Sequence, residues 1–125
     1  MLGKYDAAAT IPVRDLARAR QWYAEKLGFE PEEEEPEGLT YRSGCGYFNI
    51  YPSQFTGTAK HTLMGWQTDD LEREMREMRA KGIQFEEYDM PGLKTVNGIA
   101  KMGTDRGAWF KDLDGNILSI VQRTK

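Results

Sequence analysis

A pattern that occurs twice along the chain constrains the fold more than any other feature of the sequence. Residues 13–16 read VRDL and are followed, after a helix-like stretch, by GFE at residues 28–30. Residues 68–71 read TDDL and are followed, after a second helix-like stretch, by GIQF at residues 82–85. A repeat of this kind indicates one supersecondary unit that is used twice.

Each copy predicts a strand that leads into a helix. The strands are expected at residues 7–13 and 61–68. Asp15 can cap the free amides at the start of the first helix. Asp69 and Glu72 have the spacing of a capping box at the start of the second.

The helices are expected to be amphipathic, because apolar residues recur at the helical period. The stripes are formed by Leu16, Ala19, Tyr23 and Leu27 in the first copy and by Leu71, Met75 and Met78 in the second. We interpret the methionines here, and Met64, as core residues rather than as a special site. Gly28 and Gly82 suit the C-terminal ends of the helices.

Three strand-like stretches follow each helix. They are expected at residues 29–34, 39–43 and 47–51, and then at 84–88, about 108–112 and 116–122. The sequence therefore predicts an α+β fold with two βαβββ modules. In a chain of 125 residues these form a single domain, with module 1 at about 5–52, a linker at about 53–58 and module 2 at about 59–123.

Composition excludes several classes of function. The net charge is −3 and no Lys/Arg cluster is present, so we expect no nucleic-acid partner. No apolar run reaches the roughly 18 residues of a membrane span, and residues 1–6 lack an apolar signal core. Cys45 is the single cysteine, which excludes an internal disulfide and favours a cytoplasmic location.

Three local features have more than one interpretation. The acidic run at residues 32–37 is typical of a solvated hairpin edge, which we favour over a cation site. Cys45 lies between two glycines and has no recognisable base, so we favour an inert thiol. Residues 89–105 form a long stretch without a clear period, which could be a functional lid or a mobile loop.

Two segments resemble a known superfamily. Residues 13–29 are similar to the opening, and residues 109–116 to the ending, of vicinal-oxygen-chelate proteins, the glyoxalase/bleomycin-resistance type; Leu113 stands where the family usually has proline. The resemblance implies that each module curls its sheet into a half-barrel with the helix outside. It also implies a homodimer in which modules face each other around a cavity.

The resemblance also locates the positions that hold a metal in the enzymes of this superfamily. There the first and last strands of each module supply His, Glu or Gln ligands, and the substrate chelates the metal through adjacent oxygens. The matching positions here are Ala8, Leu63, Ser119 and Ile50, or Asn49 if the register slips by one residue. None is a good donor for a divalent cation, so we expect neither a metal nor another cofactor. Bleomycin-resistance proteins keep the fold without the metal and sequester a drug.

His61, the single histidine, falls on the same predicted strand face as Leu63, Gly65 and Gln67. We favour an ordinary hydrogen-bonded histidine over a metal ligand, while ligand contact or a role as general base stays open. The acidic residues near 86–89 are interpreted as a solvated strand end.

Strand alternation predicts which side chains line the cavity. Thr62, Met64, Trp66, Leu118 and Ile120 should face the helices, whereas Trp109 could lie in either the cavity or the core. The predicted ligand-binding residues are Ala8, Thr10, Phe48, Ile50, Tyr51, His61, Leu63, Gln67, Tyr88, Met102, Trp109 and Ser119. This mixture of apolar, aromatic and a few polar groups is typical of a site for an organic ligand.

Three functions remain possible at this point. The favoured one is a metal-independent protein that binds an apolar or aromatic small molecule in a dimer cavity, for example to sequester an antibiotic. The second is a diverged lyase, isomerase or dioxygenase that uses His61 as a base or holds a metal elsewhere. The third is a dimeric scaffold whose inward side chains simply fill the half-barrel.

Overall fold

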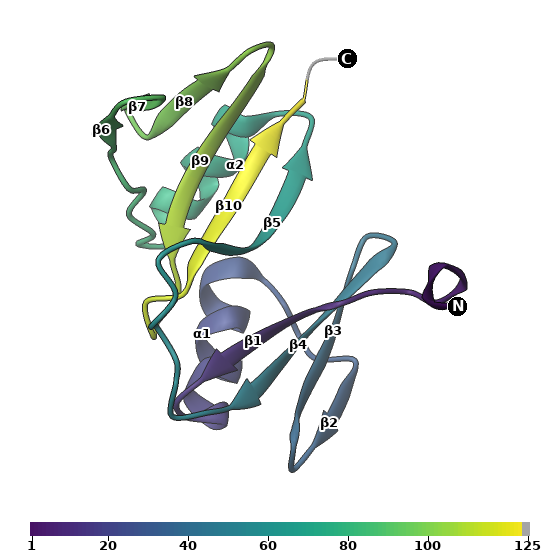
Figure 1. The fold of residues 1–125 in the computed structure, drawn as a ribbon. Coiled ribbons are helices and arrows are strands. Elements are labelled where there is room, and N and C mark those ends of the chain that lie inside the picture. Colours follow the sequence, from purple (N-terminus) through teal and green to yellow (C-terminus); the bar gives the residue numbers. More distant parts are fainter. Residues whose placement is uncertain (124–125) are drawn as a thin grey trace.

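The computed structural model describes residues 1–123 and contains two α-helices and two mixed β-sheets (Figure 1). The first module contains η1 (Leu2–Lys4), β1 (Ala9–Val13), α1 (Leu16–Leu27), β2 (Glu33–Glu35), β3 (Gly38–Ser43) and β4 (Gly46–Pro52). The second contains β5 (Thr62–Thr68), α2 (Leu71–Ala80), β6 (Asp89–Met90), β7 (Leu93–Val96), β8 (Ile99–Met102), β9 (Asp105–Lys111) and β10 (Ile117–Gln122).

The strand order confirms the predicted fold class. The first sheet has the order β1-β4-β3-β2 and the second the order β5-β10-β9-β8-β7-β6. In each sheet the first strand of the module pairs in parallel with its last strand, while the other neighbours are antiparallel. The described strands form two open sheets rather than a closed barrel.

The second module departs from the prediction after its helix. The strand expected at residues 84–88 is reduced to one isolated bridge between Phe85 and Phe110. Residues 89–102, for which we predicted no regular structure, form the short strands β6, β7 and β8. The turns at Gly92 and at Asn97-Gly98 have positive φ angles, which allow such tight reversals.

The helix ends follow local chemistry, with one correction. Asp15 accepts a hydrogen bond from the Arg18 backbone, and Gly28 ends α1 in the left-handed region with φ 78°. The second helix is capped by Asp70 rather than Asp69, because it is the Asp70 carboxylate that accepts from the Arg73 backbone at 3.1 Å. Neither helix, nor any other in residues 1–123, has the length and apolar character needed to cross a bilayer.

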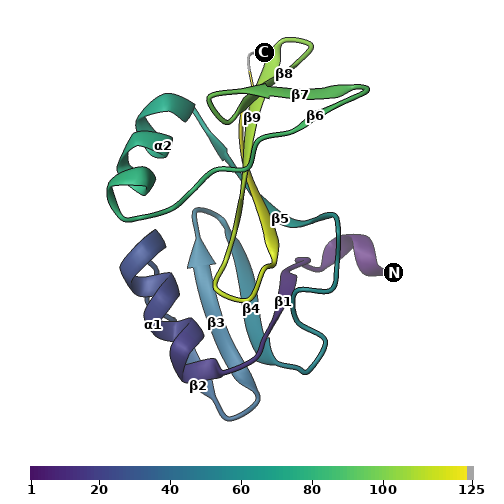
Figure 2. The ribbon, with the colours of Figure 1, turned by 90° about the vertical axis from the view of Figure 1, so that its left-hand side faces the viewer.

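The modules lie one above the other, with α1 and α2 on the same side of the strands (Figure 2). The core lies between these helices and the sheets and runs through both modules. Trp66 of β5 joins the two halves, because its ring packs against Phe29 and Phe48 of the first module and Phe110 of the second. We call the opposite side of the sheets, turned away from both helices, the helix-free face.

Candidate ligand-binding face

Strand register determines which side chains share the helix-free face. On β10, Leu118 and Ile120 are 0% and 5% exposed and belong to the core, as predicted. Ser119, between them, therefore points to the helix-free face. Its register partners, Gly65 on β5 and Trp109 on β9, point to the same side.

Gly65 and Ser119 form a close pair at the centre of this face. A Cβ atom added at Gly65 would stand 2.3 Å from the Ser119 Oγ. Only glycine therefore leaves room for Ser119 in this conformation. Gly107 of β9 adds a second small position, since a Cβ there would stand 2.7 Å from the Met102 Cε. The Ser119 Oγ and the Met102 Cε occupy the space above these two glycines, beside Trp109.

Trp109 is held in place by two contacts. Its Nε1 donates a hydrogen bond to the Thr62 Oγ1 at 3.1 Å. Thr62 is exposed and lies beside Trp109, so its predicted place toward the second helix is wrong. Its ring meets the Tyr88 ring edge to face, with centroids 5.8 Å apart. The sequence left open whether Trp109 lies in the cavity or in the core. Trp109 is half-buried and lies outside the core cluster, so it belongs to the helix-free face.

The first module contributes a more polar surface. Thr10 of β1 and Asn49 of β4 are register partners, and the Asn49 Oδ1 accepts a hydrogen bond from the Thr40 Oγ1 at 2.9 Å. Tyr51, two residues further along β4, is exposed. Ala8 is exposed just before β1.

Two predicted lining residues lie elsewhere. Phe48 and Ile50 are 2% and 0% exposed and pack in the core beneath α1, so their predicted place in the cavity is wrong. Ile50 pairs in register with Ile11, and Phe48 stacks on Tyr41 at 4.8 Å. The prediction took the alternation of β4 one residue out of phase, and Asn49 takes the outward place instead.

The other predicted lining residues do not all belong to the helix-free face, because Leu63 packs against the core and Gln67 borders the cavity between the helices described below. Leu63 is half-buried and Gln67 is exposed on β5, whereas His61 is exposed immediately before that strand. Met102 lies at the end of β8 against Gly107. Whether these residues contact a ligand stays a prediction.

The positions that correspond to metal ligands do not fit a metal. The four positions offer no carboxylate, imidazole or thiolate; they are Ala8, Leu63, Ser119 and Ile50, or Asn49 if the register slips by one residue. The Asn49 oxygen already accepts from Thr40. Within residues 1–123, no group of three His, Cys, Asp or Glu side chains is placed to hold a metal ion elsewhere.

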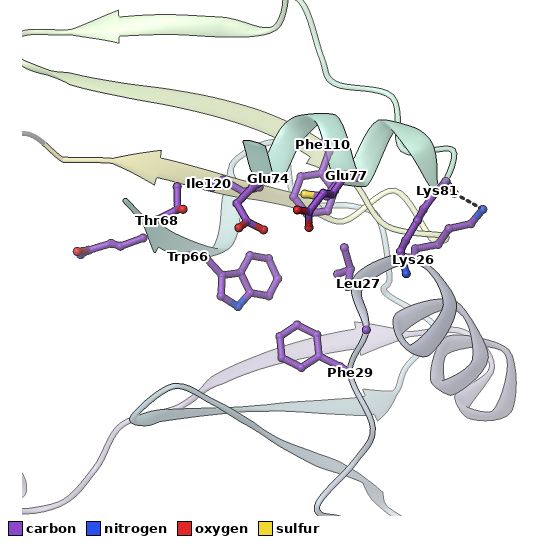
Figure 3. Close-up of a pocket in the computed structure, with 13 residues that line it drawn as sticks. Lys26, Leu27, Phe29, Trp66, Thr68, Glu74, Glu77, Lys81, Phe110 and Ile120 are labelled. Atoms are coloured by element: carbon purple, nitrogen blue, oxygen red, sulfur yellow. Dashed lines mark hydrogen bonds between the residues drawn. The ribbon is translucent and has the colours of Figure 1, made fainter. Parts of the chain in front are cut away.

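Sequence reasoning missed a cavity of about 400 Å³ on the other side of the molecule, between the two helices (Figure 3). Its apolar wall includes Phe29, Trp66 and Phe110, and its rim carries Glu74 and Lys81 among other charged residues. The repeat predicted both helices, but no local pattern indicates that Phe29 and Trp66, which belong to different modules, meet.

The buried carboxyl group of Asp112 links the two modules, away from both the helix-free face and the cavity between the helices. The Asp112 Oδ2 accepts hydrogen bonds from the Tyr23 hydroxyl at 2.8 Å and the Asn116 Nδ2 at 2.9 Å. Burial raises the pKa of Asp112, although these hydrogen bonds act in the opposite direction. Burial, followed by the charge of Asp112, raises the pKa of Tyr23 well above its ordinary value. Burial also raises the pKa of Tyr41 to about 12.

Comparison with known proteins decides the family. The profile of the Glyoxalase/Bleomycin resistance protein/Dioxygenase superfamily matches residues 6–120. The chain belongs to this superfamily. The resemblance seen in the sequence is thereby confirmed, and the family's paired modules are the ones described above. A search of curated proteins found no match.

Several solved structures share the fold of this chain at low sequence identity. The bleomycin resistance determinant encoded on transposon Tn5 is 21% identical, with a TM-score of 0.74 over 97% of this chain and 99% of that one. TnmS3, an antibiotic binding protein from Streptomyces sp. CB03234, is 18% identical, with a TM-score of 0.69 over 99% of both chains. A glyoxalase family protein from Enterococcus faecalis is 20% identical, with a TM-score of 0.72 over 97% and 99%.

Proposed function

We propose that this superfamily member binds an apolar or aromatic small molecule on its helix-free face without a metal, and that it sequesters an antibiotic. The observation that carries the proposal is the setting of Trp109. Its ring is fixed by Thr62 and Tyr88, and it lies beside the Gly65–Ser119 pair on the same face. A flat organic molecule can stack on such a ring. Within residues 1–123, no group of three metal-donor side chains lies on that surface.

Two of the structural neighbours support this choice of ligand class. The Tn5 protein is a bleomycin resistance determinant, and TnmS3 is an antibiotic binding protein. Both share the fold of this chain over nearly its whole length. An antibiotic with a flat aromatic group is therefore the first ligand to test.

We further propose that a second copy of the chain completes the site in the cytoplasm. Each sheet ends in an edge strand, β1 or β5, that pairs with a neighbour on one side only. Such edges favour association with another strand or sheet. Sedimentation equilibrium at micromolar concentration should give twice the mass of the chain; a monomer would rule out the dimeric form of the site.

The ligand test is a thermal-shift screen of natural-product antibiotics. A ligand at a hundred times its Kd should stabilise the protein by about 2.7 kcal/mol. The shift should vanish in Trp109→Ala, persist in the matched control Trp22→Ala on α1, and be unaffected by EDTA. Binding that needs a stoichiometric metal, or that survives in Trp109→Ala, would contradict the proposal.

The enzymatic alternative has less support from the structure. A general base needs a neighbour that orients it, and His61 is exposed at the start of β5, with no ion pair to a carboxylate among residues 1–123. Turnover of a substrate that is lost in His61→Ala would favour this alternative. The scaffold alternative predicts that no compound in the screen shifts the melting temperature.

A further inference from the structure

The cavity between α1 and α2 lies on the side of the sheets opposite the helix-free face and takes no part in the function proposed above. We propose that it is a second ligand site, and that its occupant is a small arylalkylamine whose protonated nitrogen lies near Glu74 and Glu77 of α2.

The size and wall of the cavity suit a flat apolar molecule. Its volume of about 400 Å³ lies within the range of roughly 300–1,000 Å³ that is usual for small-molecule sites. The Trp66 ring lies 5.9 Å from Phe29 and 6.3 Å from Phe110, centroid to centroid, with the planes tilted by only 22° and 16°. Figure 3 shows the rings of Trp66 and Phe29 side by side along one wall.

Two carboxylates, those of Glu74 and Glu77, lie near the Trp66 end of this wall. The side chains of Glu74 and Glu77 project from α2 toward Trp66 and Phe110 (Figure 3). Arg73 forms an ion pair with Glu74 at 3.6 Å, but it also forms ion pairs with Asp69 and Asp70, so it neutralises Glu74 only in part. Glu77 forms no ion pair within residues 1–123. A cation here would gain from both carboxylates and from the electron-rich ring face.

Two lysines, Lys26 and Lys81, place positive charge at the other end of the cavity. The Lys26 ammonium donates a hydrogen bond to the backbone carbonyl of Lys81 at 2.7 Å, next to the end of α1. Lys81 lies beside Leu27 in Figure 3, away from Trp66. The two ends therefore differ in sign. This separation orients an amine with its nitrogen toward α2 and its ring against Trp66.

The three tryptophans allow the two faces to be observed separately. Trp66 lines the inter-helix cavity, Trp109 lies on the helix-free face and Trp22 is outside both. Titration of 15N-labelled protein with 2-phenylethylammonium should shift the indole N–H signal of Trp66 and leave those of Trp22 and Trp109 in place. The neutral 2-phenylethanol and the anionic 3-phenylpropionate should bind more weakly.

Charge variants test the placement of the nitrogen. Glu74→Gln with Glu77→Gln should weaken binding of the ammonium probe by about threefold to tenfold, because exposed charge pairs contribute modestly. The same variant should leave 2-phenylethanol unaffected. The matched control, Glu33→Gln with Glu37→Gln on the exposed acidic run, removes equal charge elsewhere and should leave both probes unaffected.

Three outcomes would overturn the proposal. They are equal or tighter binding of 3-phenylpropionate, unchanged affinity in the Glu74/Glu77 variant, and a shift of Trp109 in place of Trp66. The proposal is independent of the antibiotic screen. A failure there removes the function of the helix-free face, whereas the Trp66 signal, the charge of the probe and the Glu74/Glu77 variant test the cavity.

Discussion

At the scale of single residues, the contact between Tyr23 and Asp112 joins the two modules through a buried hydrogen bond. Tyr23→Phe removes one hydrogen-bond donor from a buried carboxyl group while it keeps the ring. We expect the free energy of unfolding to fall by about 1–3 kcal/mol, because the buried acceptor loses a partner. Urea denaturation measures this. Tyr51→Phe, at an exposed position, is the control and should change little; equal losses in both variants would contradict the role of Tyr23.

Asp112 also predicts a pH dependence. Its pKa is raised in the folded chain, so the folded state binds this proton more tightly than the unfolded state does. The contribution of this group to stability is complete below its unfolded pKa of about 4 and is lost as the pH rises through the folded value. The unfolding free energy of the wild type minus that of Asp112→Asn should therefore fall as the pH rises from about 4 and then level off. A difference that grows with pH would mean that the hydrogen bonds outweigh burial.

At the scale of elements, the end of α1 depends on one backbone conformation. Gly28 has φ 78°, and a Cβ there would meet no atom within 4 Å. Gly28→Ala should therefore cost about 1 kcal/mol through left-handed backbone strain alone. Gly3→Ala is the matched control, because Gly3 also has open space but no positive φ. Equal denaturation midpoints for the two variants would contradict this account of the helix end.

The pairing of β5 with β10 gives a second prediction at this scale. Gly65→Ala places a Cβ against the Ser119 Oγ and should cost about 1–3 kcal/mol through overpacking. Ser119→Ala removes that oxygen, so the double variant should recover most of the loss. A thermodynamic cycle of the four proteins measures the coupling. Additive losses would show that the two side-chain positions do not compete for space.

At the scale of the whole molecule, the modules are expected to unfold together. Hydrogen bonds cross between them at Tyr23–Asp112 and at Asn116–Pro12, and Trp66 packs into both halves of the core. Urea unfolding followed by the indole signals of Trp22 in the first module and Trp109 in the second should give one midpoint. Two separate midpoints would show that the modules are independent folding units.

The sequence by itself determined the parts of the molecule that depend on neighbouring residues. The repeat predicted two modules, Asp15 and Gly28 marked the ends of α1, and the alternation in β10 placed Leu118 and Ile120 in the core. Helix caps and periodicity act over one or two turns or along one strand, so they can be recognised without the rest of the chain.

Only the tertiary structure decided the features that join distant segments. The parallel register between β1 and β4 turns Phe48 and Ile50 toward the core. The prediction from the sequence placed them on the opposite face, because it took the alternation of β4 one residue out of phase. The cavity beside Trp66 and the Tyr23–Asp112 contact each need two modules to meet. Such contacts depend on how the modules pack, and no local pattern in either partner records that packing.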